Sequence, residues 1–219
     1  MTERLKKPGS RLLAWLDAML LDHGVLRYLW NNPQEVAPGV YRSNQPSPLV
    51  LRRLAKKGLR TVVSLRGIND SAVAQFEKEA CERLGLTLIA FKMSSRGAPR
   101  AQRVTELAEL FSQIDYPVLL HCKSGADRAG FASALYLLLN GAGSVEQARA
   151  QLSWRYLHFK GAKTGRLDAF LAAYQRAHEA TGVDLLTWVQ TEYDPDEINR
   201  NFKPKGFSSW LVDRVLRRE

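Results

Sequence analysis

The chain has 219 residues, of which 45% are hydrophobic and 25% charged, the balance of a globular protein with one sizeable core. This composition excludes a largely disordered chain, a collagen-like repeat and a long coiled coil. It contains two cysteines, Cys81 and Cys122, which excludes a disulfide scaffold and a cysteine-rich zinc site. A single disulfide between them stays open, but free thiols in a reducing cytoplasm are the simpler expectation.

The formal net charge is +10, and the excess of Lys and Arg lies before residue 181. A basic surface favours anionic partners such as phosphates, acidic lipid surfaces or nucleic acid. The alternative is that the charge serves solubility alone. Charge therefore indicates a class of partner and not a particular one.

The N-terminal segment combines a basic start, residues 1–11, with a Leu- and Trp-rich run over residues 12–30. Asp17 and Asp22 interrupt this run, and each is costly at the centre of a bilayer. No small-residue cleavage site of the signal-peptide type follows it. We therefore predict an amphipathic helix in an N-terminal extension, residues 1–35, which either packs on the domain or lies on an anionic membrane surface.

Strands and helices are predicted to alternate along the chain. Short β-branched or apolar runs predict strands at residues 40–43, 59–65, 86–91 and 117–121. Segments of helical periodicity, several opened by Pro or Ser and closed by Gly, predict helices at residues 46–57, 71–84, 99–114, 128–139, 144–157 and 164–180. This alternation is typical of an α/β fold with a mainly parallel central sheet flanked by helices.

The predicted domain spans residues 36–180. Beyond Gly182 the pattern weakens: residues 193–196 are typical of a turn, and residues 207–218 of a short helix. We therefore predict that residues 181–219 form a helical C-terminal extension packed on the domain.

The residue types needed for phosphate chemistry gather in one loop, residues 121–128. It joins the apolar strand to a hydrophobic helix and reads HCKSGADR. Its small residues let successive backbone N–H groups turn inward and bind an anion, and the N-terminus of the following helix adds positive potential. Cys122 in that field is expected to be a thiolate. Arg128 offers a planar fork for two phosphate oxygens, which Lys does not match.

A Cys followed by five residues and an Arg, preceded by His and placed between strand and helix, resembles the signature of the protein tyrosine phosphatase superfamily. The segments 40–46 and 61–66 resemble its compact dual-specificity branch, especially the bacterial and atypical fungal–plant members. The resemblance covers residues 36–180. It implies a cysteine-phosphatase fold and hydrolysis of phosphate monoesters through a phosphocysteine intermediate, without a metal ion or a cofactor.

The same resemblance suggests roles for the loop residues. Cys122 is the expected nucleophile and Arg128 the clamp on the phosphate, and His121 is expected to position the loop. The residues expected to bind or surround the phosphate are Lys123, Ser124, Gly125, Ala126, His121 and Arg96. For Lys123 and Arg96, a solvated position on the surface is the alternative. A run at residues 158–165 resembles a loop that borders the active site in related bacterial sequences, and a plain connection between two helices is the alternative.

Two positions depart from the family pattern. Relatives usually carry a general-acid Asp on a separate loop, which here corresponds to residues 92–99 and contains no carboxylate. Asp127 is the best replacement as the acid, and the alternative is that it caps the following helix. Ala129 stands where most relatives have a Ser or Thr that eases phosphate release, and Ser124 is the candidate to replace that hydroxyl.

These residues are compatible with three functions. The first is a phosphatase of phosphotyrosine or other phosphoproteins in the bacterial cytoplasm. The second is a phospholipid or phosphoinositide phosphatase peripheral to the inner membrane, favoured by the basic body, Lys123 and Arg96. The third is a phosphate-binding pseudophosphatase, favoured by the missing loop acid and by Ala129. We expect no nucleic-acid partner and no metal.

Overall fold

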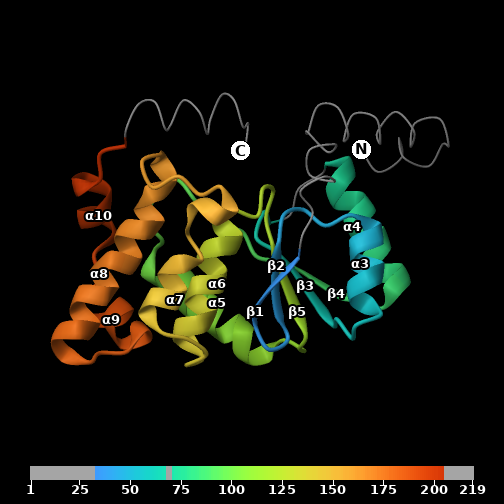
Figure 1. Cartoon of the computed structure of the whole chain (residues 1–219), viewed down its shortest axis with the longest axis horizontal. Helices are drawn as coiled ribbons and strands as arrows, with labels where there is room; N and C mark the ends of the chain where they lie inside the picture. The colour runs from blue at the N-terminus through green and yellow to red at the C-terminus, as the bar shows by residue number, and fades with distance from the viewer. Residues whose placement is uncertain (1–32, 68–70, 205–219) are drawn as a thin grey trace.

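The computed structural model describes residues 33–67 and 71–204, and the helices predicted at residues 12–30 and 207–218 lie outside this range. Its centre is a five-stranded sheet with the order β1-β2-β5-β3-β4 (Figure 1). The strands are β1 (Gln34–Ala37), β2 (Val40–Ser43), β3 (Thr61–Ser64), β4 (Thr87–Ala90) and β5 (Val118–His121). Strands β2, β5, β3 and β4 are parallel, and β1 runs antiparallel to β2. The predicted α/β fold with a mainly parallel sheet is confirmed.

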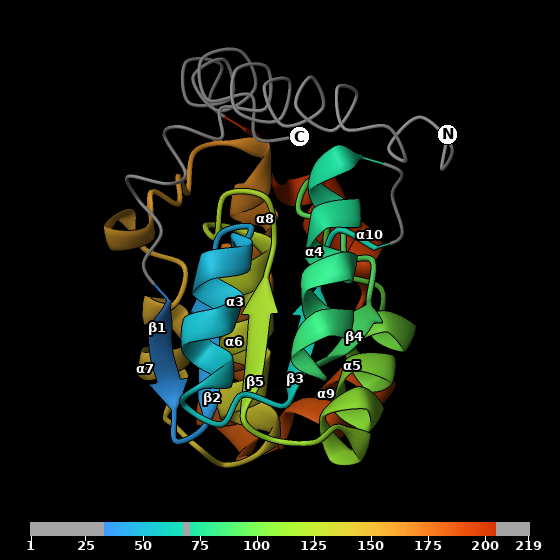
Figure 2. The same cartoon turned by 90° about the vertical axis from the view of Figure 1, so that its right-hand side faces the viewer.

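Helices cover both faces of the sheet (Figures 1 and 2). One face carries α3 (Pro48–Ala55) and α4 (Ala72–Leu84). The other carries α5 (Ala101–Gln113), α6 (Arg128–Leu139), α7 (Val145–Ala150), α8 (Arg166–Thr181) and α9 (Leu185–Thr191), and α10 (Pro195–Asn201) packs on α8. Helix α6 packs directly on β2 and β5 and is buried over most of its length. Its central place explains why its sequence is hydrophobic on nearly every side.

Strands β3 and β5 are buried along their whole length, because helices cover the sheet on both sides. Val62 and Leu119 pack with residues of α3 and α4, whereas Val63, Val118 and Leu120 belong to the larger core under α6. Successive side chains of a strand point to opposite faces, so each strand contributes to two cores. A strand buried on both faces typically reads as a nearly continuous apolar run. Strand β5 (VLLH) fits this pattern, whereas β3 (TVVS) begins and ends with a polar residue.

Side-chain caps explain where two of the predicted helices begin. Ser47 accepts a hydrogen bond from the N–H of Val50 (3.3 Å), and Ser71 accepts one from the N–H of Ala74 (3.2 Å). Each bond satisfies an amide of the first helical turn that has no partner within the helix. A serine in front of a periodic apolar segment is thus the sequence signal for both starts.

The predicted helix at residues 144–157 is wrong in its second half. Helix α7 ends at Ala150, and a short 3-10 helix, η2 (Trp154–Tyr156), follows it. The backbone carbonyl of Gln151 accepts a hydrogen bond from the guanidinium of Arg42, at 2.7 Å. The chain therefore leaves the helix where a contact with another element takes over this carbonyl.

Three elements were absent from the sequence prediction, namely β1, α9 and α10. Strand β1 is four residues long and reads QEVA, which has little of the apolar alternation that predicts a strand. Helix α9 buries Leu185, Trp188 and Val189 in the larger core. Helix α10 begins at Pro195, with Asp194 as its cap, so part of the segment predicted as a turn is a helix start.

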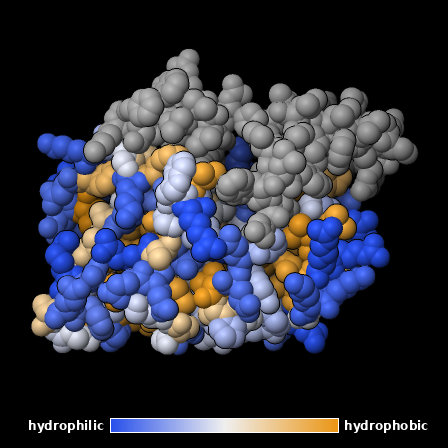
Figure 3. Space-filling view, in the orientation of Figure 1, coloured by the Kyte–Doolittle hydropathy of each residue, from blue (hydrophilic) through white to orange (hydrophobic). Residues whose placement is uncertain are grey.

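The described part of the surface is mostly hydrophilic in the view of Figure 3, with hydrophobic residues showing between the polar ones. The large hydrophobic side chains exposed in residues 33–67 and 71–204 are Leu49, Tyr116 and Trp154. No helix within these ranges combines the length and the apolar character that crossing a membrane requires.

We expect Phe170→Ala to lower the free energy of unfolding by roughly 3–5 kcal/mol. Phe170 is fully buried on α8, and its ring centroid lies 5.3 Å from that of Phe131, 5.3 Å from that of Trp188 and 4.9 Å from that of Tyr193. Its removal leaves a cavity where α6, α8 and α9 meet. Urea unfolding measures the loss, and Leu49→Ala, at a side chain 51% exposed, is the control with little expected change. Equal losses in the two variants would contradict this packing.

Candidate active site

The loop at residues 121–128 lies at the carboxyl end of β5, the middle strand of the sheet. Open parallel sheets bind their ligands beyond this edge. Cys122 is 1% exposed, and its Sγ accepts a hydrogen bond from the backbone N–H of Gly125 at 3.2 Å. The loop thus turns a backbone amide toward the sulfur. Around it, Ala126 and Asp127 are buried, and the half-buried loop residues are Lys123, Ser124, Gly125 and Arg128.

Gly125 is needed for this turn. Its φ of +75° lies in the left-handed region, and a Cβ on it would stand 2.6 Å from the backbone nitrogen of Asn44. The segment after β2 therefore packs tightly against the loop, and the N–H of Gln45 donates to the carbonyl of Lys123 at 3.3 Å. A side chain at position 125 would push these two segments apart.

Arg42, on β2, is buried beneath the loop at 1% exposure. Its Nη2 donates to the carbonyls of Gly125 (2.6 Å) and Ala126 (3.3 Å), and its Nη1 donates to Gln151. The guanidinium also stacks on the ring of Tyr156, with Cζ 3.7 Å from the ring centroid. Burial lowers the pKa of Arg42 to about 10, so the side chain keeps its charge at neutral pH.

These contacts orient the loop amides. The carbonyl and the N–H of a trans peptide unit point in opposite directions. Because the carbonyls of Gly125 and Ala126 face Arg42, the N–H groups of Ala126 and Asp127 face away from it. The Ala126 N–H donates a hydrogen bond to the Oγ of Ser124 at 3.4 Å, on that other side of the loop. The arrangement leaves the amides on the side where an anion can bind.

His121 contacts a carboxylate from the opposite layer of helices. Its Nε2 lies 2.9 Å from Oε1 of Glu77 on α4, and both side chains are buried. The two atoms are at ion-pair distance, but their directions do not meet hydrogen-bond geometry. This contact links α4 to the residue directly before the nucleophile.

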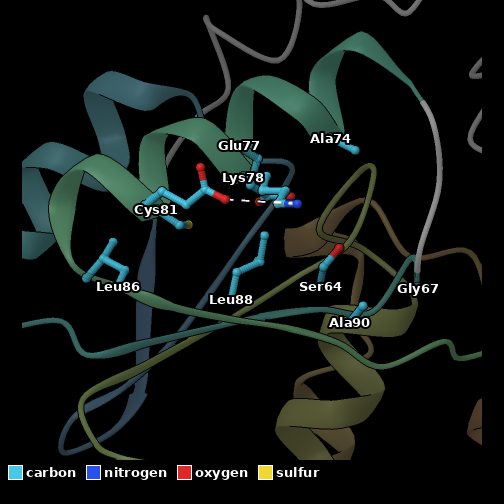
Figure 4. A pocket seen from close by; sticks show the side chains of 10 residues that line it. Ser64, Gly67, Ala74, Glu77, Lys78, Cys81, Leu86, Leu88 and Ala90 are labelled. Carbon is cyan, nitrogen blue, oxygen red and sulfur yellow. Dashed lines mark ion pairs between the residues drawn. The ribbon is translucent and has the colours of Figure 1, made fainter. Parts of the chain in front are cut away.

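Glu77 also lines a hollow of about 450 Å³ between α4 and strands β3 and β4 (Figure 4). Cys81 faces the same hollow, and Lys78 and Glu82 form an ion pair there, at 3.9 Å. Burial, with a smaller effect of nearby carboxylates, raises the pKa of Cys81 to about 12. Cys81 is thus a protonated thiol at neutral pH, and both cysteines are free.

Asp127 does not cap α6, although it occupies the capping position. Its side chain makes no capping hydrogen bond, so the capping alternative is wrong. Its Oδ1 instead lies 2.6 Å from Nδ1 of His158. The other ring nitrogen of His158 lies 2.6 Å from Oδ2 of Asp168, on the first turn of α8. A buried imidazole therefore joins two carboxylates.

The charge state of His158 follows from this arrangement. Burial alone would favour the neutral ring, but hydrogen bonds and attraction to Asp127 and Asp168 outweigh it and raise the pKa of His158 to about 9. The imidazole is therefore mostly protonated at neutral pH and donates from both nitrogens. His158 opens the segment that the sequence placed beside the active site, but its pairing with Asp127 had no sequence signal.

The segment with Arg96, where relatives usually carry an acid, is held by the C-terminal helices. The carbonyl of Arg96 accepts a hydrogen bond from Nη1 of Arg166 at 3.1 Å. The N–H of Ala98 donates to Oδ1 of Asn199 at 3.0 Å. These contacts attach the segment to α8 and α10. Among the described residues, no cluster of three or more His, Cys, Asp or Glu side chains is suited to hold a metal ion.

Comparison with known proteins assigns the family. The model of a family described as a DSP-PTPase phosphatase fused to NAD+ kinase matches residues 29–167, more than half of the chain. The chain belongs to this dual-specificity phosphatase family. No curated protein matches it.

Solved structures share the fold of this phosphatase. TpbA of P. aeruginosa is 20% identical, with a TM-score of 0.50 over 78% of this chain and 89% of that one. A DUF442 protein of Shewanella putrefaciens CN-32 is 20% identical, with a TM-score of 0.51 over 66% of this chain and 93% of that one. Tk-PTP in its active form is 18% identical, with a TM-score of 0.50 over 66% and 98%. These likenesses show the fold alone.

We expect Arg42→Lys to damage this phosphatase through its loop. One ammonium group cannot reach the carbonyls of Gly125, Ala126 and Gln151 together, so at least one buried carbonyl loses its partner, at a cost of about 1–3 kcal/mol. We expect the free energy of unfolding to fall by that amount and kcat/KM for an aryl phosphate to fall at least about tenfold. Denaturation and steady-state kinetics measure the two effects. The control is Arg53→Lys, at an exposed position of α3, and indistinguishable kinetics of the two variants would refute the role of Arg42.

Proposed function

We propose that the chain is a metal-independent phosphatase that hydrolyses phosphate monoesters through a phosphocysteine intermediate on Cys122. The observation that carries the proposal is the 3.2 Å hydrogen bond from the Gly125 N–H to the sulfur, inside a loop whose Gly125 and Ala126 carbonyls are turned toward Arg42. Membership of the dual-specificity phosphatase family supports it. In this proposal, the nucleophile and the amides that bind the anion lie in one loop.

In the first step, the Cys122 thiolate attacks phosphorus and the bond from phosphorus to the leaving oxygen breaks. Arg128 and the loop amides hold the other phosphate oxygens, which carry the charge of the transition state. The leaving oxygen takes a proton from Asp127. The products of this step are the alcohol or phenol and the phosphocysteine.

In the second step, water attacks the phosphocysteine and the bond between sulfur and phosphorus breaks. One proton of the water goes to Asp127, and the thiolate and inorganic phosphate are released. Ala129 directly follows Arg128 and offers no hydroxyl to assist this departure, so we expect the second step to be the slower one. Ser124, inside the loop, is the candidate to supply a hydroxyl in its place.

The first substrate class that we propose is phosphotyrosine or another phosphoprotein, with the reaction taking place in the cytoplasm. A phosphorylated lipid or inositol head group is the second candidate, favoured by the formal net charge of +10 and by Lys123 within the loop. A phosphate-binding protein without turnover is the third, since residues 92–99 hold no carboxylate. A phosphate-release panel over phosphotyrosine peptides, phosphoserine peptides and phosphoinositides separates them.

We expect Cys122→Ser to abolish phosphate release from an aryl phosphate and to leave the fold and phosphate binding intact. The serine hydroxyl is far less acidic than a thiol, so the loop field cannot turn it into a comparable nucleophile. Steady-state kinetics measures phosphate release, circular dichroism the fold, and calorimetric titration with inorganic phosphate the binding. Cys81→Ser is the control with unchanged turnover, and a chelator should leave the wild-type rate unchanged. Turnover retained by the Cys122→Ser variant would contradict the mechanism.

We expect Arg128→Lys to be nearly as damaging as Arg128→Ala. A point charge does not reproduce the planar fork that follows the phosphoryl group into its transition state. Comparison of kcat/KM for the two variants on one aryl phosphate measures this. If the Lys variant kept most of the wild-type efficiency, Arg128 would be a general electrostatic contributor and its proposed geometry wrong.

A further inference from the structure

We infer that His158, anchored by Asp168, is a positioning residue that stores the proton which Asp127 delivers to the leaving group and recovers from water. The inference rests on the proposed function and deepens it, because it assigns the source of the acid's proton. It gives a role to a histidine outside the phosphate loop.

The three side chains come from separate elements. Asp127 precedes α6, His158 follows the 3-10 helix η2, and Asp168 lies on the first turn of α8. Both contacts with the ring nitrogens are 2.6 Å long, which is short for a nitrogen–oxygen pair and fits charge-assisted bonds. The His158 side chain is 0% exposed, and those of Asp127 and Asp168 are 7% and 18% exposed.

An isolated aspartic acid has a pKa of about 3.9, so at neutral pH it seldom carries the proton that a general acid must give. Relatives place their acid on a loop that here has no carboxylate. The imidazolium of His158 holds its proton up to a pH of about 9, in contact with Asp127. The pair can therefore supply at neutral pH a proton that an isolated aspartic acid would have lost.

The proton released in the first step is recovered in the second. The resting cluster is an imidazolium between two carboxylates. As the leaving oxygen departs, the proton on Nδ1 passes to Asp127 and on to that oxygen, which leaves a neutral His158 with its remaining proton donated to Asp168. When water attacks the phosphocysteine, its proton passes to Asp127 and back to Nδ1. The imidazolium is restored as phosphate leaves.

Within the described part of the chain, Lys160 and Arg42 are further charged groups near the cluster. Nζ of Lys160 lies 3.9 Å from Oδ1 of Asp168, on a side chain that is 66% exposed. The buried guanidinium of Arg42 interacts electrostatically with Asp127 and with Cys122. Each carboxylate of the cluster therefore interacts with a cation besides the imidazolium, Asp168 with Lys160 and Asp127 with Arg42.

The His158→Gln variant tests whether His158 holds the proton that Asp127 delivers. Gln can hold one carboxylate by a hydrogen bond but cannot carry the proton. We expect turnover of an alkyl phosphate, a poor leaving group, to fall by roughly 10²-fold, and that of an acidic aryl phosphate to change only a few-fold. Asp127→Asn should show the same difference between the substrates. The matched control is His178→Gln on α8, whose ring contacts the carbonyl of Val183 at 2.9 Å, with both rates unchanged.

The Asp168→Asn variant tests whether the charge of Asp168 stabilises the imidazolium of His158. Asn keeps the shape but removes one of the two carboxylates that stabilise the imidazolium, so the proton should be lost at lower pH. In the wild type, alkyl phosphate turnover should fall as the pH rises through about 9. We expect the midpoint of this fall in turnover to lie about one pH unit lower in Asp168→Asn. In His158→Gln we expect the fall to be absent.

An NMR titration of the imidazole in the full chain gives a readout that does not need turnover. Protonation of His158 at pH 7, lost at lower pH in Asp168→Asn, is the expected result. A neutral ring at pH 7, an unmoved midpoint in Asp168→Asn, or equal losses on both substrates in His158→Gln would each overturn the inference. These outcomes are distinct from failure of the phosphatase proposal, which appears as turnover retained by Cys122→Ser.

Discussion

The buried guanidinium of Arg42 is the contact on which the site depends. It reaches from β2 to two loop carbonyls and to the end of α7, so it fixes the sheet, the loop and helix α7 to one another. The cost of burying the charge is visible in its lowered pKa of about 10. Since peptide carbonyls and amides point in opposite directions, a cation beneath the loop sets the direction of the amides above it.

Contacts from both layers of helices hold loop residues near Cys122. On the α4 side, Glu77 contacts His121, the residue before the nucleophile, and on the α8 side, Asp168 and His158 hold Asp127. The sheet brings these supports together because β5 is its middle strand, with helices on both faces. The phosphate loop is short, but elements from both layers of helices position it.

The parts of the site that are local in sequence could be predicted, and the parts that join distant segments could not. The alternating strands and helices, the loop between β5 and α6, and Cys122 with Arg128 are all patterns within a few residues. Arg42 binds a carbonyl 83 positions away, and His158 binds Asp127 from 31 positions away. Neither contact joins residues at a separation that a sequence pattern could reveal. The end of α7 was mispredicted for the same reason, because a tertiary contact outweighs helical periodicity there.

The covalent bond between phosphorus and the sulfur of Cys122 is the central claim, and rapid quenching tests it most directly. The full chain is mixed with an aryl phosphate, quenched within one turnover and digested, and its peptides are examined by mass spectrometry. The account predicts one phosphoryl group on the peptide that contains Cys122, formed and lost at rates compatible with turnover. Turnover without phosphorylated Cys122, or with the phosphoryl group on another residue, would contradict it.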